Sequence, residues 1–294
     1  MTGPRALPQR VNVVPFGPRT VISLAAASVV GVMAFCWPLL AAPGSQLVAH
    51  AKDAPWLFAL LLPLILAVVL AQVADGGLDA KGIAMLGVLA AVAAALRPFG
   101  GGSAGFEPMW IVLILGGRAL GPGFGFSLGA IGMFASALIT GGVGPWLPFQ
   151  MVAAGWVGLG AGLLPRRVSG RAELALLGAY AFGACVLYGF VLNLWFWPFL
   201  TTDSGLSPAL AYLPGSPLAE NLANWLRFCL TTSLAYDLPR AMLAVALVLL
   251  AGRPVLLAVR RGARRAAFEV PVHFSDNGEV HRVSRPGELP QSLT

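Results

Sequence analysis

The sequence contains few charged residues, few cysteines and few histidines. Only 11% of its 294 residues are charged and 57% are hydrophobic, whereas a soluble domain is typically about 25% charged. The three cysteines, Cys36, Cys185 and Cys229, form no CxxC pair, so neither a disulfide framework nor a zinc site of the usual spacing is indicated. Two of the three histidines lie in the polar C-terminal region. A metal site is therefore not expected.

The sequence also lacks the motifs of ATP use and of covalent chemistry. Neither of its two lysines, Lys52 and Lys81, belongs to a GxxxxGK[ST] loop, so the chain has no P-loop of its own. It has no HExxH pattern and no paired-aspartate motif suited to magnesium. We therefore expect neither an enzyme nor a bound cofactor, and any ATP-driven activity requires another subunit.

Long apolar runs fill most of the chain, whose mean hydropathy is +0.80. A membrane span needs about 20 mostly apolar residues. Eight segments of this kind can be drawn, at roughly 20–42, 56–74, 81–97, 108–121, 123–140, 149–164, 172–198 and 237–259. The fourth is short, as expected for a helix that tilts, breaks or is covered by protein. We predict an all-α polytopic membrane protein with about eight transmembrane helices.

The net charge of +7 comes from arginines at segment ends, which is typical of a membrane protein and not of a nucleic-acid-binding one. The clusters are Arg5, Arg10 and Arg19; Arg166, Arg167 and Arg171; and Arg253, Arg260, Arg261, Arg264 and Arg265. Positive residues favour the cytoplasmic side, and eight spans place all three clusters there. Both termini are thus expected in the cytoplasm, at the plasma membrane. A signal peptide is the less favoured interpretation of the first segment, because its apolar run exceeds the usual ~7–15 residues.

The same topology places several polar and glycine-rich segments outside. Arg97 ends the third segment, and Glu107 follows a glycine loop. Either the two side chains form an ion pair that pins the loop, or the loop contacts a ligand. Asn193 is a polar group near membrane depth and needs a partner, while Trp197 is typical of an interfacial aromatic belt. Residues 217–230 are expected to form an amphipathic helix over the outer face.

Small residues recur at every fourth position in the third segment. They lie at Gly87, Ala91 and Ala95 and, in a second register, at Ala90 and Ala94. Such a stripe lets another helix approach closely. Comparable stripes occur on the first and sixth segments, at Ser23, Ala27 and Gly31 and at Ala154, Gly158 and Gly162. From the residues alone, packing within the protein is favoured over a partner.

The order of these pieces from residue 81 on resembles the substrate-binding S component of energy-coupling factor (ECF) vitamin transporters. An alanine-rich helix ending in Arg97-Pro98 is followed by a glycine loop and then by LILGGRALGPGFGFSLGA, ITGGVGPWLPFQM and WVGLGAGLLP. The segment GGVGPWLPFQM is the most specific part and is most similar to actinobacterial members assigned to cobalamin. The resemblance covers about residues 81–260.

The resemblance implies a domain organisation and a docking surface. A cytoplasmic N-terminus (1–19) and two additional transmembrane helices (20–80) would precede a six-helix core (81–262), and a polar, flexible cytoplasmic tail (263–294) would follow. In the family, small residues in an AxxxA pattern on the first core helix dock onto a T component that carries two ATPase subunits. That pattern implies docking through Ala91 and Ala95 of the third segment, with Ala90 and Ala94 as the alternative register.

The resemblance also gives a role to TGGVGPWLPFQM, residues 140–151, as a cap on the outer vestibule. Pro145 would hold the segment rigid, which lowers the entropy cost of binding. Gly142 and Gly144 would let the backbone approach the ligand, Trp146 would stack on a ring system, and Gln150 would form a hydrogen bond. The alternative is a tight interhelical turn with Trp146 anchored at the membrane interface.

The implied function is capture of a vitamin from outside, with cobalamin favoured, and its delivery by docking to the T component with its ATPases. The first alternative is an S component for thiamin, riboflavin or another micronutrient. A self-sufficient secondary transporter is the second, and the lack of an acidic residue at any span centre argues against it. An intramembrane enzyme is the least favoured, since no catalytic constellation is present.

Overall fold

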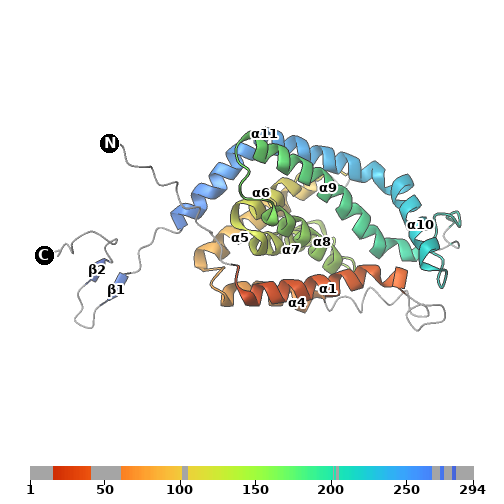
Figure 1. Cartoon of the computed structure of the whole chain (residues 1–294), viewed down its shortest axis with the longest axis horizontal. Coiled ribbons are helices and arrows are strands. Elements are labelled where there is room, and N and C mark those ends of the chain that lie inside the picture. Colours follow the sequence, from red (N-terminus) through yellow and green to blue (C-terminus); the bar gives the residue numbers. More distant parts are fainter. Residues whose placement is uncertain are drawn as a thin grey trace.

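The computed structural model describes residues 16–40, 61–100, 105–200, 202, 205–266, 272–274 and 280–282. In these ranges the helices are α1 (Pro18–Leu40), α4 (Leu61–Ala74), α5 (Ala80–Leu96), α6 (Trp110–Leu120), α7 (Pro122–Thr140), α8 (Leu147–Leu163), α9 (Arg171–Phe196), α10 (Leu218–Phe228) and α11 (Leu234–Ala266). Short 3₁₀ turns follow α5 and α9 at Arg97–Gly100 and Trp197–Phe199, and a π-helical turn, Cys229–Ser233, joins α10 to α11. In Figure 1, α1 and α4 lie along one side of the bundle and α11 along the other, with α5 to α8 between them.

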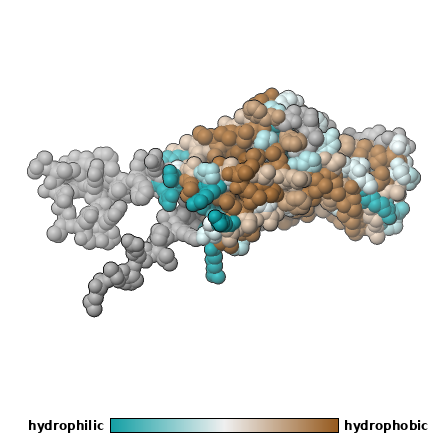
Figure 2. Space-filling view, turned by 90° about the horizontal axis from the view of Figure 1, so that it is seen from above, coloured by the Kyte–Doolittle hydropathy of each residue, from teal (hydrophilic) through white to brown (hydrophobic). Residues whose placement is uncertain are grey.

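The prediction of an all-α polytopic membrane protein is confirmed. Each of the eight predicted segments contains one helix, although residues 56–60 of the second segment lie outside the described residues. Among the described residues, five helical stretches are long and apolar enough to cross a membrane, and α4, α6 and α8 are shorter apolar helices. Figure 2 shows hydrophobic residues covering the middle of one face, with hydrophilic residues gathered toward its two ends.

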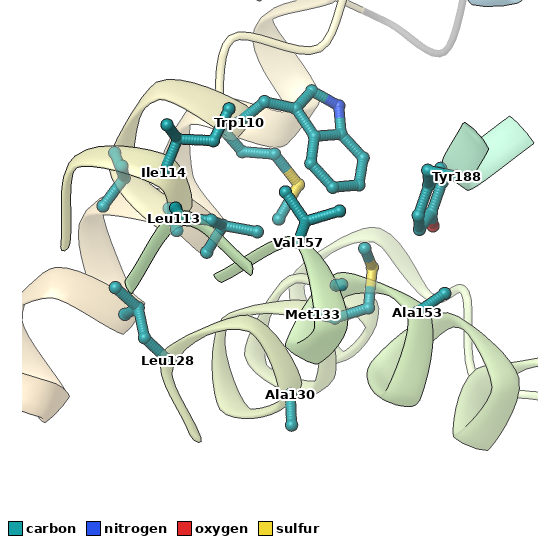
Figure 3. Packing of buried hydrophobic residues seen from close by; sticks show 14 of the residues in the cluster. Trp110, Leu113, Ile114, Leu128, Ala130, Met133, Ala153, Val157 and Tyr188 are labelled. Atoms are coloured by element: carbon teal, nitrogen blue, oxygen red, sulfur yellow. The ribbon is translucent and has the colours of Figure 1, made fainter. Parts of the chain in front are cut away.

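The short helix α6 is surrounded by protein. Nine of its eleven residues are buried, and it packs against α7, α8 and α11. Trp110, Leu113 and Ile114 of α6 point toward Met133 of α7 and Val157 of α8 (Figure 3). Because α6 has no lipid-facing side, it does not need the length of a membrane span.

Small residues let α7 and α8 pack backbone to backbone. Gly158 of α8 lies so close to Gly125 of α7 that a Cβ on either one would overlap the backbone of the other. A Cβ at Gly129 would likewise overlap the backbone of Ala154. The stripe predicted on the sixth segment therefore serves packing inside the protein. Gly31 of the first segment also faces α8, where a Cβ would meet the side chains of Val152 and Trp156.

Polar contacts join α4 to the rest of the bundle and join the two N-terminal helices to each other. The Gln72 side chain of α4 donates to the backbone oxygen of Gly123 at 2.9 Å and to Ser127 Oγ at 2.7 Å in α7. At the same end, the Asp75 carboxylate accepts hydrogen bonds from the backbone N–H and the hydroxyl of Thr20, both at 2.8 Å. The bond from the Thr20 backbone holds the pKa of Asp75 below its usual range.

The C-terminal region differs from its prediction in two ways. Helix α11 continues to Ala266, beyond the predicted end of the last span and beyond the predicted core boundary at residue 262, because alanine and arginine are strong helix formers in water as well as in lipid. In the tail, β1 (Val272–Phe274) pairs antiparallel with β2 (Val280–Arg282), where a flexible segment was predicted.

Candidate functional site

A cavity of about 370 Å³ lies near the end of the bundle where α10 joins α11. Its walls come from the ends of α5, α8 and α10, the residues before α6, the C-terminal part of α9, the π-helical turn and the first turns of α11. The lining residues are Arg97, Glu107, Gln150, Tyr188, Gly189, Leu192, Asn193, Phe196, Phe228, Thr232, Ser233, Tyr236, Asp237 and Arg240. The cavity is thus a polar chamber at one end of an otherwise apolar bundle.

Arg240 is the centre of a charged network in the cavity wall. Its Nε donates to Glu107 Oε2 at 2.9 Å and its Nη1 donates to Asp237 Oδ1 at 2.7 Å. The guanidinium carbon lies 5.3 Å from the ring centre of Tyr188, within the range of a cation–π contact. Arg97 contributes a second positive charge, with its Nε 3.9 Å from Glu107 Oε1. Two arginines and two carboxylates leave the network without net charge.

Neighbouring groups fix the orientation of both carboxylates. The Trp110 indole donates to Glu107 Oε2 at 3.0 Å, and the Ser233 hydroxyl donates to Asp237 Oδ2 at 2.5 Å. Helix α9 approaches Asp237 so closely at Gly189 that a Cβ there would overlap the carboxylate. The position of Asp237 therefore depends on the absence of a side chain at residue 189.

Four of the predicted ligand-binding residues line this cavity, and the structure brings Arg97 and Glu107 together, which was one of the two alternatives that the sequence left open. Their ion pair is long, however, because Glu107 is bonded more closely to Arg240. The Arg97 Nη1 donates instead to Ser136 Oγ of α7 at 2.7 Å. Arg97 thus joins the end of α5 to α7 as well as facing the cavity.

Asn193 and Gln150 are the other two predicted residues at the cavity. The Asn193 amide donates to Cys229 Sγ at 3.3 Å, which provides the partner that its depth in the membrane requires. The Gln150 Oε1 atom is buried, and no hydrogen-bond donor among the described residues reaches it. The residue therefore lines the cavity with a buried oxygen that is unpaired among the described residues.

The four residues predicted just before Gln150 do not line the cavity. The Trp146 indole donates to the backbone oxygen of Gly142 at 3.0 Å and packs edge-on against Trp195, with ring centres 6.0 Å apart. A Cβ at Gly144 would meet the Trp146 ring, and Pro145 is the residue between them. The segment thus folds on itself as a tight turn before α8, in agreement with the structural alternative.

Trp197 also lies away from the cavity. Its side chain is fully buried, its indole donates to the backbone oxygen of Leu210 at 2.8 Å, and its ring packs edge-on against Tyr212 at 5.2 Å. These contacts use both the ring and its polar atom. The prediction of Trp197 as a ligand contact is therefore corrected: its side chain packs against the segment that holds Leu210 and Tyr212.

Sequence reasoning missed the residue at the centre of the site, Arg240, and its neighbours Tyr188 and Asp237. All three lie inside or at the edge of apolar helices, where an isolated polar residue has no identifiable partner in the sequence alone. The available signal was the pair Asp237 and Arg240, which are separated by one helical turn at the start of the last span. A charged pair in that position is a functional candidate.

The two small-residue registers of α5 face in different directions. Gly87, Ala91 and Ala95 are exposed, and a Cβ at Gly87 would meet nothing within 4 Å. Ala90 and Ala94 are buried, at 2% and 0% exposure, on the side of the helix that faces the bundle. The proposed role of Ala90 and Ala94 in docking is therefore corrected, and the exposed register remains as a candidate surface.

A family model described as "ECF transporter, substrate-specific component" matches residues 81–252, which is more than half of the chain. The match begins at α5 and ends within α11, so it includes every element that lines the cavity and excludes α1 and α4. No curated protein and no solved structure matches the chain. In the described ranges there is no cluster of three or more histidine, cysteine or acidic residues suited to a metal ion.

Proposed function

The chain belongs to the family of ECF transporter substrate-specific components, and we propose that its cavity binds a vitamin at the outer side of the plasma membrane. The bound vitamin would be delivered by docking to a T component that carries two ATPase subunits. The observation that carries this proposal is the charged, hydrogen-bonded chamber built around Arg240 inside the family-matched region. Ionisable residues at such a depth are expensive and are typical of functional sites.

The cavity also indicates what kind of ligand it suits. Its volume of about 370 Å³ lies at the lower end of the ~300–1,000 Å³ usual for small-molecule sites. The self-neutralised network favours a ligand without strong net charge, and the unpaired Oε1 of the lining residue Gln150 favours one that carries an N–H donor. The sequence resemblance favours cobalamin, whose amide groups match this requirement. Cobalamin is larger than the chamber, however, so part of it would lie outside, whereas riboflavin or thiamin is closer in size.

The orientation proposed for the chain rests on the distribution of arginines. The end of the bundle away from the cavity holds the ion pairs of Glu173 with Arg118 at 2.7 Å and with Arg260 at 2.6 Å, beside the exposed residues Arg166 and Arg167. Positive residues favour the cytoplasmic side. We therefore propose that this end and both termini face the cytoplasm, and that the cavity opens outward.

Cysteines introduced at Val143 and Arg167 should be labelled from opposite sides of the membrane. Both residues are exposed in the structure, and position 143 avoids Gly144, where a side chain would meet Trp146. Each cysteine is introduced into a variant of the chain that lacks the three native cysteines. In intact cells, a membrane-impermeant maleimide is expected to modify V143C only, and R167C is expected to react after permeabilisation. Labelling of both positions in intact cells would overturn the proposed topology.

The alanine variants of Trp146 and Gln150 should have different effects on ligand binding. Because Gln150 lines the cavity and its buried Oε1 has no donor among the described residues, Gln150→Ala is expected to weaken affinity by about tenfold, the usual order for one hydrogen bond in a buried site. Trp146→Ala is expected to lower the thermal unfolding temperature while changing affinity by less than about twofold, since the ring lies in the turn outside the cavity. A larger loss of affinity for Trp146→Ala would restore the capping role that the sequence indicated.

An uptake assay tests the function itself. The chain is expressed in cells together with its T component and ATPases, in parallel with a version in which the ATPases cannot hydrolyse ATP. Accumulation of labelled vitamin is expected only with active ATPases. Uptake that persists without ATP hydrolysis and follows an ion gradient would contradict the proposal and favour a secondary transporter.

A further inference from the structure

The residues between α9 and α11 form a structured unit at the cavity end of the bundle. We call residues 205–228 the outer cap; it consists of a looped section and α10. Two buried asparagines of α10 hold the loop. Asn221 exchanges hydrogen bonds with the backbone N–H and oxygen of Leu213, at 3.0 and 2.8 Å, and Asn224 donates to the backbone oxygen of Pro208 at 2.9 Å. The loop and α10 are therefore tied together.

The outer cap leads directly into the wall of the cavity. Phe228, its last residue, lines the cavity, and so do Thr232 and Ser233 of the π-helical turn that follows. Turns of this kind occur mostly as local insertions in helices, frequently at functional sites. Cys229, the first residue of the turn, is buried and accepts the hydrogen bond from Asn193 of α9. Any displacement of the outer cap would therefore alter the cavity.

The outer cap is attached to α1 by a buried hydrogen bond. The Tyr212 hydroxyl donates to the backbone oxygen of Pro38 at 3.1 Å, and Tyr212 is 1% exposed. Leu39 of α1 packs against the same cluster of Trp197, Tyr212 and Phe228. The last four carbonyls of a helix have no donor within that helix, so Tyr212 satisfies one of these groups at the end of α1.

Helix α1 is itself held against α8 along its length. The Trp156 indole of α8 donates to Ser28 Oγ at 3.0 Å, and the Phe35 ring meets Phe149 edge-on with ring centres 5.0 Å apart. Figure 1 shows α1 running along the bundle toward the end where α10 lies. Helix α1 therefore connects the core to the outer cap from outside the family-matched region, which begins at residue 81.

We propose that the N-terminal helix pair holds the outer cap against the cavity through the contact of Tyr212 with Pro38, and that this contact limits how fast a ligand enters and leaves. Tyr212 is then a positioning residue, because it touches the cap and α1 but not the cavity. This inference rests on the proposed function for the presence of a ligand. The attachment of the cap itself can be measured without any ligand.

The native Cys229 reports on opening of the cap. In the full-length chain with Cys36→Ala and Cys185→Ala, Cys229 is the single remaining cysteine, and it is fully buried at the base of the cap. In detergent without ligand, Tyr212→Phe removes only the hydroxyl and is expected to raise the alkylation rate by N-ethylmaleimide about two- to tenfold, the change that corresponds to one net hydrogen bond. Leu39→Ala, made on the α1 side of the contact, is expected to raise it as well.

Tyr180→Phe is the matched control. The Tyr180 hydroxyl also donates to a backbone oxygen, that of Val157 at 2.6 Å, but it joins α9 to α8 and does not contact the cap. This variant is expected to leave the alkylation rate of Cys229 unchanged. An unchanged rate in Tyr212→Phe would overturn the proposal, and so would an equal rise in both tyrosine variants, because that would indicate general loosening of the bundle.

The ligand arm of the experiment separates this inference from the proposed function. If the wild-type chain binds cobalamin or riboflavin, dissociation of that vitamin is expected to accelerate in Tyr212→Phe by a factor similar to the alkylation rate, and not in Tyr180→Phe. Unchanged dissociation despite faster alkylation would overturn the link between the cap and the ligand. Failure of the wild type to bind any tested vitamin would count against the proposed function, while the alkylation rates would still decide whether α1 holds the cap.

Discussion

Replacing Arg240 with methionine is expected to destabilise the protein by about 3–5 kcal/mol and to abolish ligand binding, because removing one partner leaves buried charges uncompensated. Arg240 is bonded to both Glu107 and Asp237, and the Asp237 side chain is only 2% exposed. Arg97 lies too far away to replace both contacts. The free energy of unfolding in detergent and the vitamin affinity measure the two effects separately.

A compensating variant distinguishes lost stability from lost recognition. In Arg240→Met combined with Glu107→Gln and Asp237→Asn, no carboxylate is left unpaired by the loss of Arg240. Arg97 loses its long ion pair with Glu107 but keeps its hydrogen bond to Ser136, so part of the stability is expected to return. Binding is expected to stay weak, since the charged wall of the cavity is gone. Arg240→Lys keeps the charge but not the planar fork that reaches two carboxylates. Its stability and its vitamin affinity are therefore expected to lie between those of the wild type and of Arg240→Met. Full binding by the triple variant would show that Arg240 acts only in folding.

Ala91→Trp is expected to abolish uptake while leaving vitamin binding intact. Ala91 lies between Gly87 and Ala95 on the exposed face of α5, and small residues at this spacing let a partner helix approach closely. A tryptophan there would separate the two surfaces; overpacking of this kind costs about 1–3 kcal/mol, or about five- to hundredfold in docking. Uptake in cells with the T component and ATPases, and binding by the purified chain, are measured side by side.

Two further tryptophan variants, one at an exposed position and one at a buried position, serve as controls. Ala26 of α1 is also exposed but lies outside the family-matched region, so Ala26→Trp is expected to leave uptake unchanged. Ala94 is fully buried, so Ala94→Trp is expected to impair folding and binding together. If Ala91→Trp reduced binding and uptake equally, the exposed stripe would have a structural role and the docking surface would have to lie elsewhere.

Much of the fold could be predicted from the sequence because the bilayer imposes a simple rule on composition. A run of about 20 apolar residues is recognisable without any knowledge of its neighbours, so α1, α5, α7 and α9 begin and end close to their predicted positions. The continuation of α11 to Ala266 was missed because an arginine-rich segment indicates the end of a membrane span. Arginine is nevertheless a good helix former, so the helix continues beyond the span.

The candidate site was predicted only in part, because a binding residue is defined by what it meets across the bundle. Arg97, Glu107 and Asn193 stood out as polar residues at span ends, and all three line the cavity. The resemblance gave Trp146 a place in a cap on the vestibule, yet its ring is used within its own turn. The direction in which a side chain points at a helix end depends on packing, which spacing alone does not determine. Likewise, only the packing of α5 reveals which alanine register is buried.

Titration of the purified full-length chain with cobalamin, riboflavin and thiamin by calorimetry is the most direct test of the cavity as a vitamin-binding site. The expected result is saturable binding of one vitamin by the chain alone, without T component or ATPases, with weaker binding in Gln150→Ala and loss of binding in the triple variant of Arg240, Glu107 and Asp237. Binding that appears only when the other subunits are present, or that is unaffected by both of these changes, would contradict the assignment of the cavity as the capture site.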